Sequence, residues 1–196
     1  MPPSPETHLR VELMLTAKCR DEIQSFFKKE YHCLSEAIFH HMHLTVYHCE
    51  APMPHADLGS FETDIAIPMA ETRFMVMAPG GENAKSHLEP NRCKIGIRIK
   101  QRGGALYGIQ DIRQRFCALE TEELLQGRNQ STNTRSAFGA KSFQPHVTML
   151  RQKNGIQRDL KPIGEHFRNT IKELRFDRLV VRKVDYIHKS PPSRKR

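Results

Sequence analysis

Two His-x-Thr triplets, His43-Leu44-Thr45 and His146-Val147-Thr148, constrain the fold of this chain more than any other feature. Apolar residues flank both triplets, and several are β-branched, which predicts that each triplet lies on a β-strand. Side chains alternate between the two faces of a strand, so the histidine and threonine of each triplet point to the same side. The triplets therefore predict two strands that each present one imidazole and one hydroxyl.

The segments that lead to each triplet repeat one order of elements, a strand, a helix and then the triplet strand. Alternating apolar residues predict the strands, and apolar residues at three- and four-residue spacing predict amphipathic helices. The first unit comprises strand 9–16, helix 18–31 and strand 41–49, and the second comprises strand 94–100, helix 104–126 and strand 142–150. This repetition predicts a duplicated α+β plan, and neither strand-to-helix turn carries a glycine-rich phosphate-binding loop.

Further elements are predicted outside the repeated units. Residues 61–67 and 72–78 are rich in strand formers, and Pro68 with a short turn separates them, which predicts a hairpin. The stretch 128–141 is polar and shows no periodicity, so we expect a mobile loop there. The last two predicted elements are a third helix over 163–174 and a strand over 179–187.

The length of 196 residues fits one domain that buries its own core. We expect this domain to span residues 9–189, after a flexible lead of residues 1–8 and before a basic tail of residues 190–196. The five cysteines form no Cys-x-x-Cys pair, so we expect free thiols in a cytoplasmic or nuclear protein. The first residues do not resemble a targeting segment and no apolar run approaches membrane-spanning length, so we expect no membrane partner.

The charge of the chain points to a polyanionic partner. A net charge of +9 and a pI near 9.5 favour nucleic acid, because phosphate neutralisation dominates such affinities. Part of the excess lies in Lys189 and residues 194–196, which a disordered end would also explain. Charge alone therefore does not identify the partner.

The paired triplets, with Val46 after the first and Pro145 before the second, resemble the signature of the 2H phosphoesterase superfamily, and within it the 2′-5′ RNA ligase-like cyclic phosphodiesterases. The likeness covers about residues 9–189 in the order of elements, and in letters it rests on the triplets and their neighbours. It implies two pseudo-symmetric lobes, each an antiparallel-rich sheet with packed helices, whose triplets face each other across a central groove. It also implies an RNA, oligonucleotide or nucleotide substrate and catalysis without metal or cofactor, and we expect a monomer.

The residue types fit the chemistry of phosphodiester cleavage. One group must take a proton from the attacking oxygen and another must protonate the departing oxygen, and imidazole can do either near neutral pH. Threonine hydroxyls can donate hydrogen bonds to the non-bridging oxygens of the phosphate. The resemblance assigns His43 and His146 as the acid-base pair and Thr45 and Thr148 as phosphate ligands. For hydrolysis of a 2′,3′-cyclic phosphate we take His146 as the base and His43 as the acid, and the opposite assignment stays open because the reverse reaction exchanges the two roles.

Three more residues are candidates for substrate binding. Arg151 follows the second triplet and could hold a phosphate or a base, and a surface arginine at a strand end is the alternative. Tyr47 is in phase with His43 and Thr45 and could stack on a base, although an aromatic at this spacing also suits packing. Arg135 is a further candidate, in the loop 128–141.

Histidines crowd around the first triplet, which raises the alternative of a metal site. Alternation predicts that His41 and His43 face away from His40 and His48, and no Cys or His spacing matches a structural zinc pattern. We therefore expect no metal.

Three functions remain open at this point. The leading hypothesis is a metal-independent phosphodiesterase acting on 2′,3′-cyclic phosphate ends of RNA or on 2′-5′-linked oligonucleotides, with ligation as the reverse reaction. The segment Tyr47-His48-Cys49, where the family usually has Phe-Leu-Gly, leaves open a second hypothesis, the degradation of a cyclic or 2′-5′ nucleotide messenger. The third is an RNA-binding module without catalysis, which predicts RNA affinity that falls steeply with salt.

Overall fold

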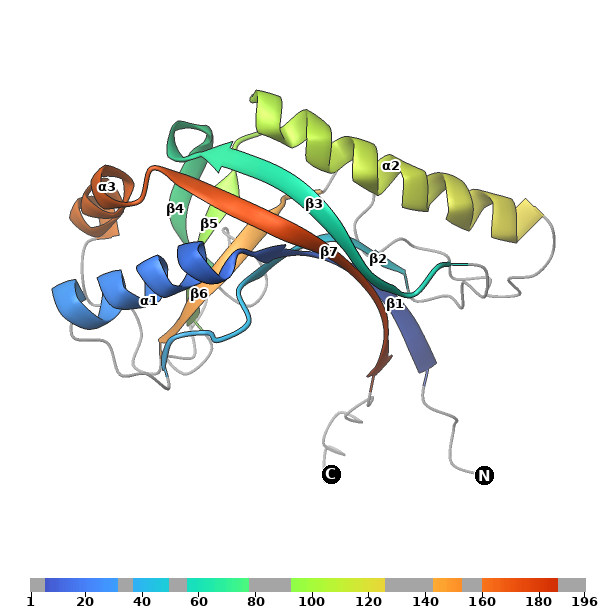
Figure 1. The fold of residues 1–196 in the computed structure, drawn as a ribbon, viewed down its shortest axis with the longest axis horizontal. Helices are drawn as coiled ribbons and strands as arrows, with labels where there is room; N and C mark the ends of the chain where they lie inside the picture. Colours follow the sequence, from blue (N-terminus) through green and yellow to red (C-terminus); the bar gives the residue numbers. More distant parts are fainter. Residues whose placement is uncertain are drawn as a thin grey trace, which may run out of the picture.

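The computed structural model describes residues 6–31, 37–49, 56–77, 93–125, 143–152 and 160–186. These residues form an α+β fold in which α-helices pack on a single antiparallel sheet (Figure 1). The elements follow in the order β1 (Glu6–Leu15), α1 (Ala17–Tyr31), β2 (His43–Cys49), β3 (Gly59–Pro68), η2 (Met69–Glu71), β4 (Thr72–Met77), β5 (Cys93–Ile99), α2 (Gly104–Leu125), β6 (His146–Gln152), α3 (Leu160–Thr170) and β7 (Glu173–Tyr186).

The seven strands lie in the order β3-β7-β1-β2-β6-β5-β4, so the two triplet strands are neighbours in the middle of the sheet. Both predicted strand-helix-strand units form, as β1-α1-β2 and β5-α2-β6, and the prediction of a repeated order is confirmed. Each unit contributes its last strand to the central pair. The sheet is continuous across that pair. The predicted flexible lead 1–8 is wrong for residues 6–8, because they pair with β7 and belong to β1. The rest of that lead, the predicted loop 128–141 and the predicted basic tail 190–196 lie outside the described residues.

The sheet curls into a half-barrel because its two edge strands are consecutive in the chain (Figure 1). Only the short 3-10 turn η2 separates β3 from β4. The N–H of Met69 donates to the carbonyl of Lys172, and the N–H of Lys100 donates to the carbonyl of Glu71, at 2.9 and 2.8 Å. These bonds tie η2 to the start of β7 and to the end of β5, which lie toward opposite edges of the sheet.

The predicted hairpin between residues 61–67 and 72–78 is wrong, although both strands form. β3 pairs with β7, where Ile67 lies opposite Leu174, and β4 pairs with β5, where Phe74 lies opposite Ile97. The hydrogen bonds of η2 direct the two strands apart. β3 pairs with the last strand of the sequence, and β4 pairs with the strand that follows it.

The end of the third helix also differs from the prediction. The periodicity predicts a helix over 163–174, but α3 ends at Thr170 and Leu174 belongs to β7. Pairing of β7 with both β1 and β3 supplies backbone hydrogen bonds and buries Leu174 completely. Tertiary pairing therefore overrides the local preference for a helix.

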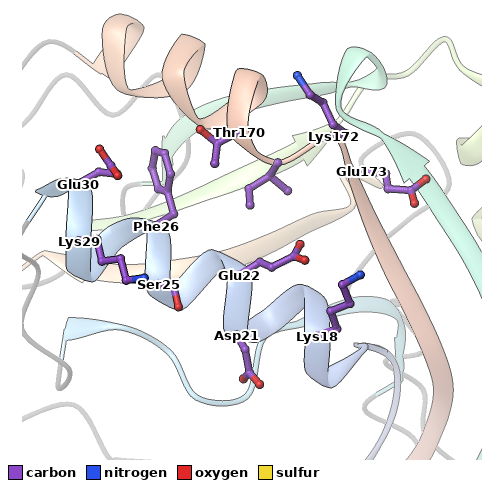
Figure 2. A pocket seen from close by; sticks show the side chains of 11 residues that line it. Lys18, Asp21, Glu22, Ser25, Phe26, Lys29, Glu30, Thr170, Lys172 and Glu173 are labelled. Atoms are coloured by element: carbon purple, nitrogen blue, oxygen red, sulfur yellow. The ribbon is translucent and has the colours of Figure 1, made fainter.

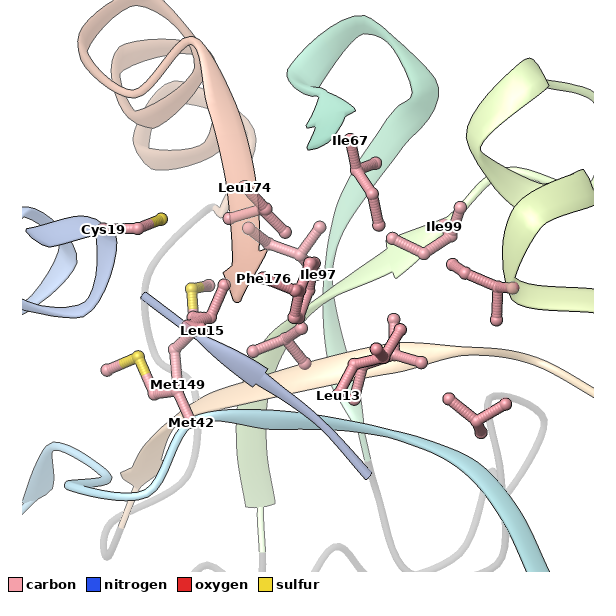
Figure 3. Close-up of a cluster of buried hydrophobic side chains, with 14 of the residues drawn as sticks. Leu13, Leu15, Cys19, Met42, Ile67, Ile97, Ile99, Met149, Leu174 and Phe176 are labelled. Carbon is pink, nitrogen blue, oxygen red and sulfur yellow. The ribbon is translucent and has the colours of Figure 1, made fainter. Parts of the chain in front are cut away.

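The core covers one face of the curled sheet. Leu13 on β1, Ile97 on β5 and Phe176 on β7 are fully buried there, together with side chains from the edge strand β3 (Figure 3). Aromatic rings join α1 and α3 to this core. Phe167 of α3 packs against Phe26 with ring centroids 5.0 Å apart, and contacts two further rings at 5.7 Å, those of Phe27 and Phe74.

Helix α2 packs on β2 and β3 at the other end of the sheet. The guanidinium group of Arg113, a residue of α2, donates to the carbonyl of Val46 at 3.3 Å. It also lies over the ring of Phe143, 4.7 Å from the ring centroid. One buried side chain of α2 thus contacts β2 and also the segment that leads into β6. Among the described residues, no helix is both long and apolar enough to cross a membrane.

Candidate active site

The two triplets lie side by side in opposite directions. β2 and β6 pair antiparallel through Leu44 and Val147, the middle residues of the triplets. This register places His43 beside Thr148 and Thr45 beside His146. Leu44 and Val147 are both fully buried in the core, whereas the four polar residues are half-buried on the opposite face. The prediction that the histidine and threonine of each triplet share a face is confirmed.

The strands on either side bring charged residues to the same face. Glu12 of β1 lies opposite Thr45, and Met14 lies opposite His43. On the other side, Arg98 of β5 lies opposite His146. We call this surface of the sheet, from Glu12 across the two triplets to Arg98, the polar face.

His146 is held so that one ring nitrogen is available as a base. Its Nδ1 lies 3.0 Å from the carbonyl oxygen of Gln144, and a carbonyl only accepts, so the proton of the neutral ring is on Nδ1. Burial lowers the pKa of His146, and the positive charges of Arg98, Lys94 and His43 lower it further, against the opposing effect of the Gln144 carbonyl. The lowered pKa favours the neutral ring, in which Nε2 carries no proton.

His43 has the same backbone anchor and a different partner at Nε2. Its Nδ1 lies 2.9 Å from the carbonyl oxygen of His41. Its Nε2 lies 3.2 Å from Oε1 of Glu12, a carboxylate that can only accept. With protons on both nitrogens, the ring donates to the carbonyl and forms an ion pair with Glu12. The two histidines therefore differ in their charged neighbours. A carboxylate lies at Nε2 of His43, whereas the charges that act on the His146 ring are positive.

Tyr47 does not share the polar face, and the prediction that it lies in phase with His43 is wrong. Consecutive residues Val11 and Glu12 of β1 pair with Tyr47 and Thr45, so Val46 is an extra residue in β2. Such a β-bulge reverses the side-chain phase beyond it. Tyr47 is fully buried, its hydroxyl donates to the Glu120 carboxylate of α2, and burial with this bond raises its pKa. The alternative of a packing role is the correct one, because a buried ring cannot stack on a base.

The same bulge moves His48. His48 pairs with Arg10 of β1 and so lies on the polar face with His43, contrary to the predicted alternation. Among the residues that the structure describes, no three His, Cys, Asp or Glu side chains gather as metal ligands would. Cys49 lies in the core and its thiol donates to Glu120, and within the described part of the chain Cys19, Cys49 and Cys117 form no disulfide.

Of the two remaining candidates for substrate binding, the structure places Arg151 and not Arg135. Arg151 belongs to β6 and pairs with Lys94 in the register, next to an irregularity between Ile95 and Gly96. Arg135 lies outside the described residues. Glu12 is a site residue that the sequence alone does not identify. In the alternating pattern of β1 it looks like any other polar residue on the solvent-facing side. Only the register of β1 with β2 reveals that its carboxylate meets His43.

A surface hollow lies elsewhere on the molecule, between α1 and the junction of α3 with β7 (Figure 2). Its volume is about 790 Å³, and no triplet residue lines it. The walls alternate acidic and basic side chains, among them Glu22, Lys29, Lys172 and Glu173. Such mixed charge offers no concentrated positive potential for a phosphate, so the polar face is the better candidate for a nucleotide site.

Comparison of the chain with protein-family models, with curated proteins and with solved structures finds no match.

Proposed function

We propose that this protein is a metal-independent phosphodiesterase of the 2H type, acting on 2′,3′-cyclic phosphate ends of RNA or on 2′-5′-linked oligonucleotides. The observation that carries the proposal is the antiparallel pairing of the triplets through Leu44 and Val147. It puts the two histidines at opposite corners of a four-residue patch and the two threonines at the other corners. Neighbouring strands are about 4.8 Å apart, so a single phosphate above the patch reaches all four side chains.

The arrangement suits hydrolysis by in-line displacement. Nε2 of His146 takes a proton from water as the water oxygen bonds to phosphorus. The bond from phosphorus to one ribose oxygen breaks, and Nε2 of protonated His43 gives its proton to that departing oxygen. Thr45 and Thr148 donate hydrogen bonds to the non-bridging oxygens, where negative charge develops. Return of the proton from His146 to His43 through water completes the cycle.

The two-lobed 2H fold belongs to the same proposal. The units β1-α1-β2 and β5-α2-β6 meet at the β2–β6 pair, and each contributes one triplet, which supports pseudo-symmetric halves. In this reading the first half also includes β3 and β7, and the second includes β4.

Positive side chains on both sides of the triplets support a nucleotide or oligonucleotide substrate. Arg10 of β1 and Arg182 of β7 are paired in the register on one side, and Lys94 and Arg98 of β5 lie on the other. β1 and β5 are three strands apart in the sheet, about 14 Å, which is further than the oxygens of one phosphate reach. The flanking cations therefore suit further phosphates of the same substrate.

The test is turnover by the purified full chain in the presence of EDTA. Three substrates are offered in parallel, an RNA ending in a 2′,3′-cyclic phosphate, a 2′-5′ oligoadenylate and a cyclic oligonucleotide. Hydrolysis of the first two supports the proposal, and preference for the cyclic oligonucleotide favours the degradation of a messenger. RNA binding that weakens steeply with salt, without product from any substrate, would overturn catalysis and leave a binding module.

The acid limb of the pH–rate profile is expected below pH 6.5, because burial and the charges of Arg98 and Lys94 lower the pKa of His146 from 6.5. The base then stays unprotonated as the pH falls through 6.5. The measurement is kcat/KM against pH, which reports the free enzyme.

The same shift affects the stability of the fold. Below pH 6.5 the unfolded chain binds more protons at His146 than the folded chain does, so this residue makes the free energy of unfolding fall as the pH falls.

Lys94→Gln provides the matched comparison for the pH–rate profile. Removal of one positive charge near His146 is expected to move the acid limb to higher pH. A wild-type limb at or above pH 6.5, or a shift to lower pH in Lys94→Gln, would contradict the assignment of His146 as the base.

A further inference from the structure

Glu12 is a buried carboxylate on the polar face. Its side chain is 2% exposed, although it lies on a strand between the half-buried residues Arg10 and Met14. Its two oxygens contact three cationic groups. Oε2 lies 2.8 Å from Arg182, and Oε1 lies 3.5 Å from Arg10 and 3.2 Å from Nε2 of His43. A buried carboxylate is costly unless charges compensate it, and here the compensation comes from three strands.

In the part of the chain that the structure describes, the two arginines leave the Oε1 atom of Glu12 without a hydrogen bond, and His43 is the nearest ion-pair partner of that atom. The Arg182 contact on Oε2 is at hydrogen-bonding distance, whereas Oε1 accepts no hydrogen bond from the described residues. Nε2 of His43 is the group closest to Oε1 among its ion-pair partners. A small movement of the His43 ring would therefore complete a hydrogen bond at a buried acceptor that lacks one.

We infer that Glu12 is a positioning residue for His43. Its carboxylate holds the His43 ring with a proton on Nε2, and this makes His43, rather than His146, the acid of the pair. This inference rests on the proposed function. The Nδ1 anchors of the two rings are alike, so their charged neighbours decide their roles. The carboxylate of Glu12 lies at Nε2 of His43, whereas the charges that act on His146 are those of Arg98, Lys94 and His43, all positive.

The groups around His43 define what a variant must leave intact. Glu12 faces it from β1, His146 lies diagonally on β6, and Arg10 and Arg182 reach it only through Glu12. Substitution of Glu12 therefore removes the negative charge that pairs with this ring in the described part of the chain, and it also releases two guanidinium groups.

The kinetic test compares Glu12→Gln with Glu62→Gln, the same change at an exposed residue of β3. Glu12→Gln is expected to lower kcat on a cyclic-phosphate RNA by about 10- to 100-fold, part of the 10²–10⁴ that a general acid contributes. It is also expected to move the alkaline limb of the pH–rate profile to lower pH, with KM changed little. Glu12→Asp keeps the charge and should recover the position of that limb in part. An unchanged alkaline limb in Glu12→Gln would overturn the inference.

Nitrogen-15 NMR of the histidine rings tests the inference in the wild-type chain, without reliance on the folding of a variant. At a pH at which His146 carries a proton on Nδ1 alone, His43 should carry protons on both nitrogens. Equal protonation of the two rings across the titration would overturn the inference. A chain that shows this difference and hydrolyses no substrate would overturn the proposed function while upholding the Glu12–His43 pair.

Discussion

His146→Ala and His43→Ala are each expected to lower kcat/KM for a cyclic-phosphate RNA by about 10²–10⁴-fold, the contribution of a positioned general acid or base. Each variant removes one of the two proton transfers on opposite sides of the phosphorus. The double variant should lose little more than either single variant, because residues that act as a unit are not additive. The measurement is initial rate with EDTA present, after thermal unfolding has shown that each variant folds.

His40→Ala is the matched control, since His40 is an exposed histidine three residues before His43. It should retain wild-type activity. Full activity in either triplet variant would refute acid-base catalysis by the pair. A loss of equal size in His40→Ala would show that the effect comes from the segment and not from the polar face.

Phe167→Ala is expected to lower the free energy of unfolding by about 3–5 kcal/mol, the usual cost of removing a buried phenylalanine. Phe167 is fully buried and its ring contacts Phe26, Phe27 and Phe74, so the substitution leaves a cavity where α1, α3 and β4 meet. A domain of this size loses about 2–4 °C of Tm per kcal/mol, so the melting temperature should fall by roughly 6–20 °C.

Phe61→Ala on β3 serves as the comparison, because the Phe61 side chain is 43% exposed. Its removal should change the free energy of unfolding by much less than the removal of Phe167. The measurement is the free energy of unfolding of both variants in urea. Equal decreases of this free energy would contradict the placement of Phe167 at the centre of the aromatic cluster.

Local pattern predicted most of the elements, because alternation and helical periodicity depend on neighbouring residues alone. The strands that became β1, β2 and β5 and the helices α1 and α2 are within a few residues of their predicted bounds. The errors arose where a distant partner decides the outcome. The partners of β3 and β4 and the early end of α3 depend on pairing with β7 and β5, which no local window contains.

The candidate site divides in the same way. The shared face of His43 and Thr45 follows from alternation, and the resemblance supplied the expectation that the two triplets meet. The position of Tyr47 could not be predicted, because the bulge at Val46 exists only relative to β1 and is held by a hydrogen bond from Arg113. Glu12 escaped notice for a related reason, since its contact with His43 requires the register between two strands.

The route of the chain through the sheet has a consequence for how the protein folds. After β3 the chain passes through η2, forms β4, β5 and β6, and returns to pair β7 with β1 and β3, so that Glu6 lies opposite Tyr186. The segment carrying the second triplet thus lies in the chain between β3 and its partner β7. Closing such long loops costs chain entropy before any contact repays it, which makes folding slow and cooperative. The histidines come together only when segments more than a hundred residues apart in the chain have joined.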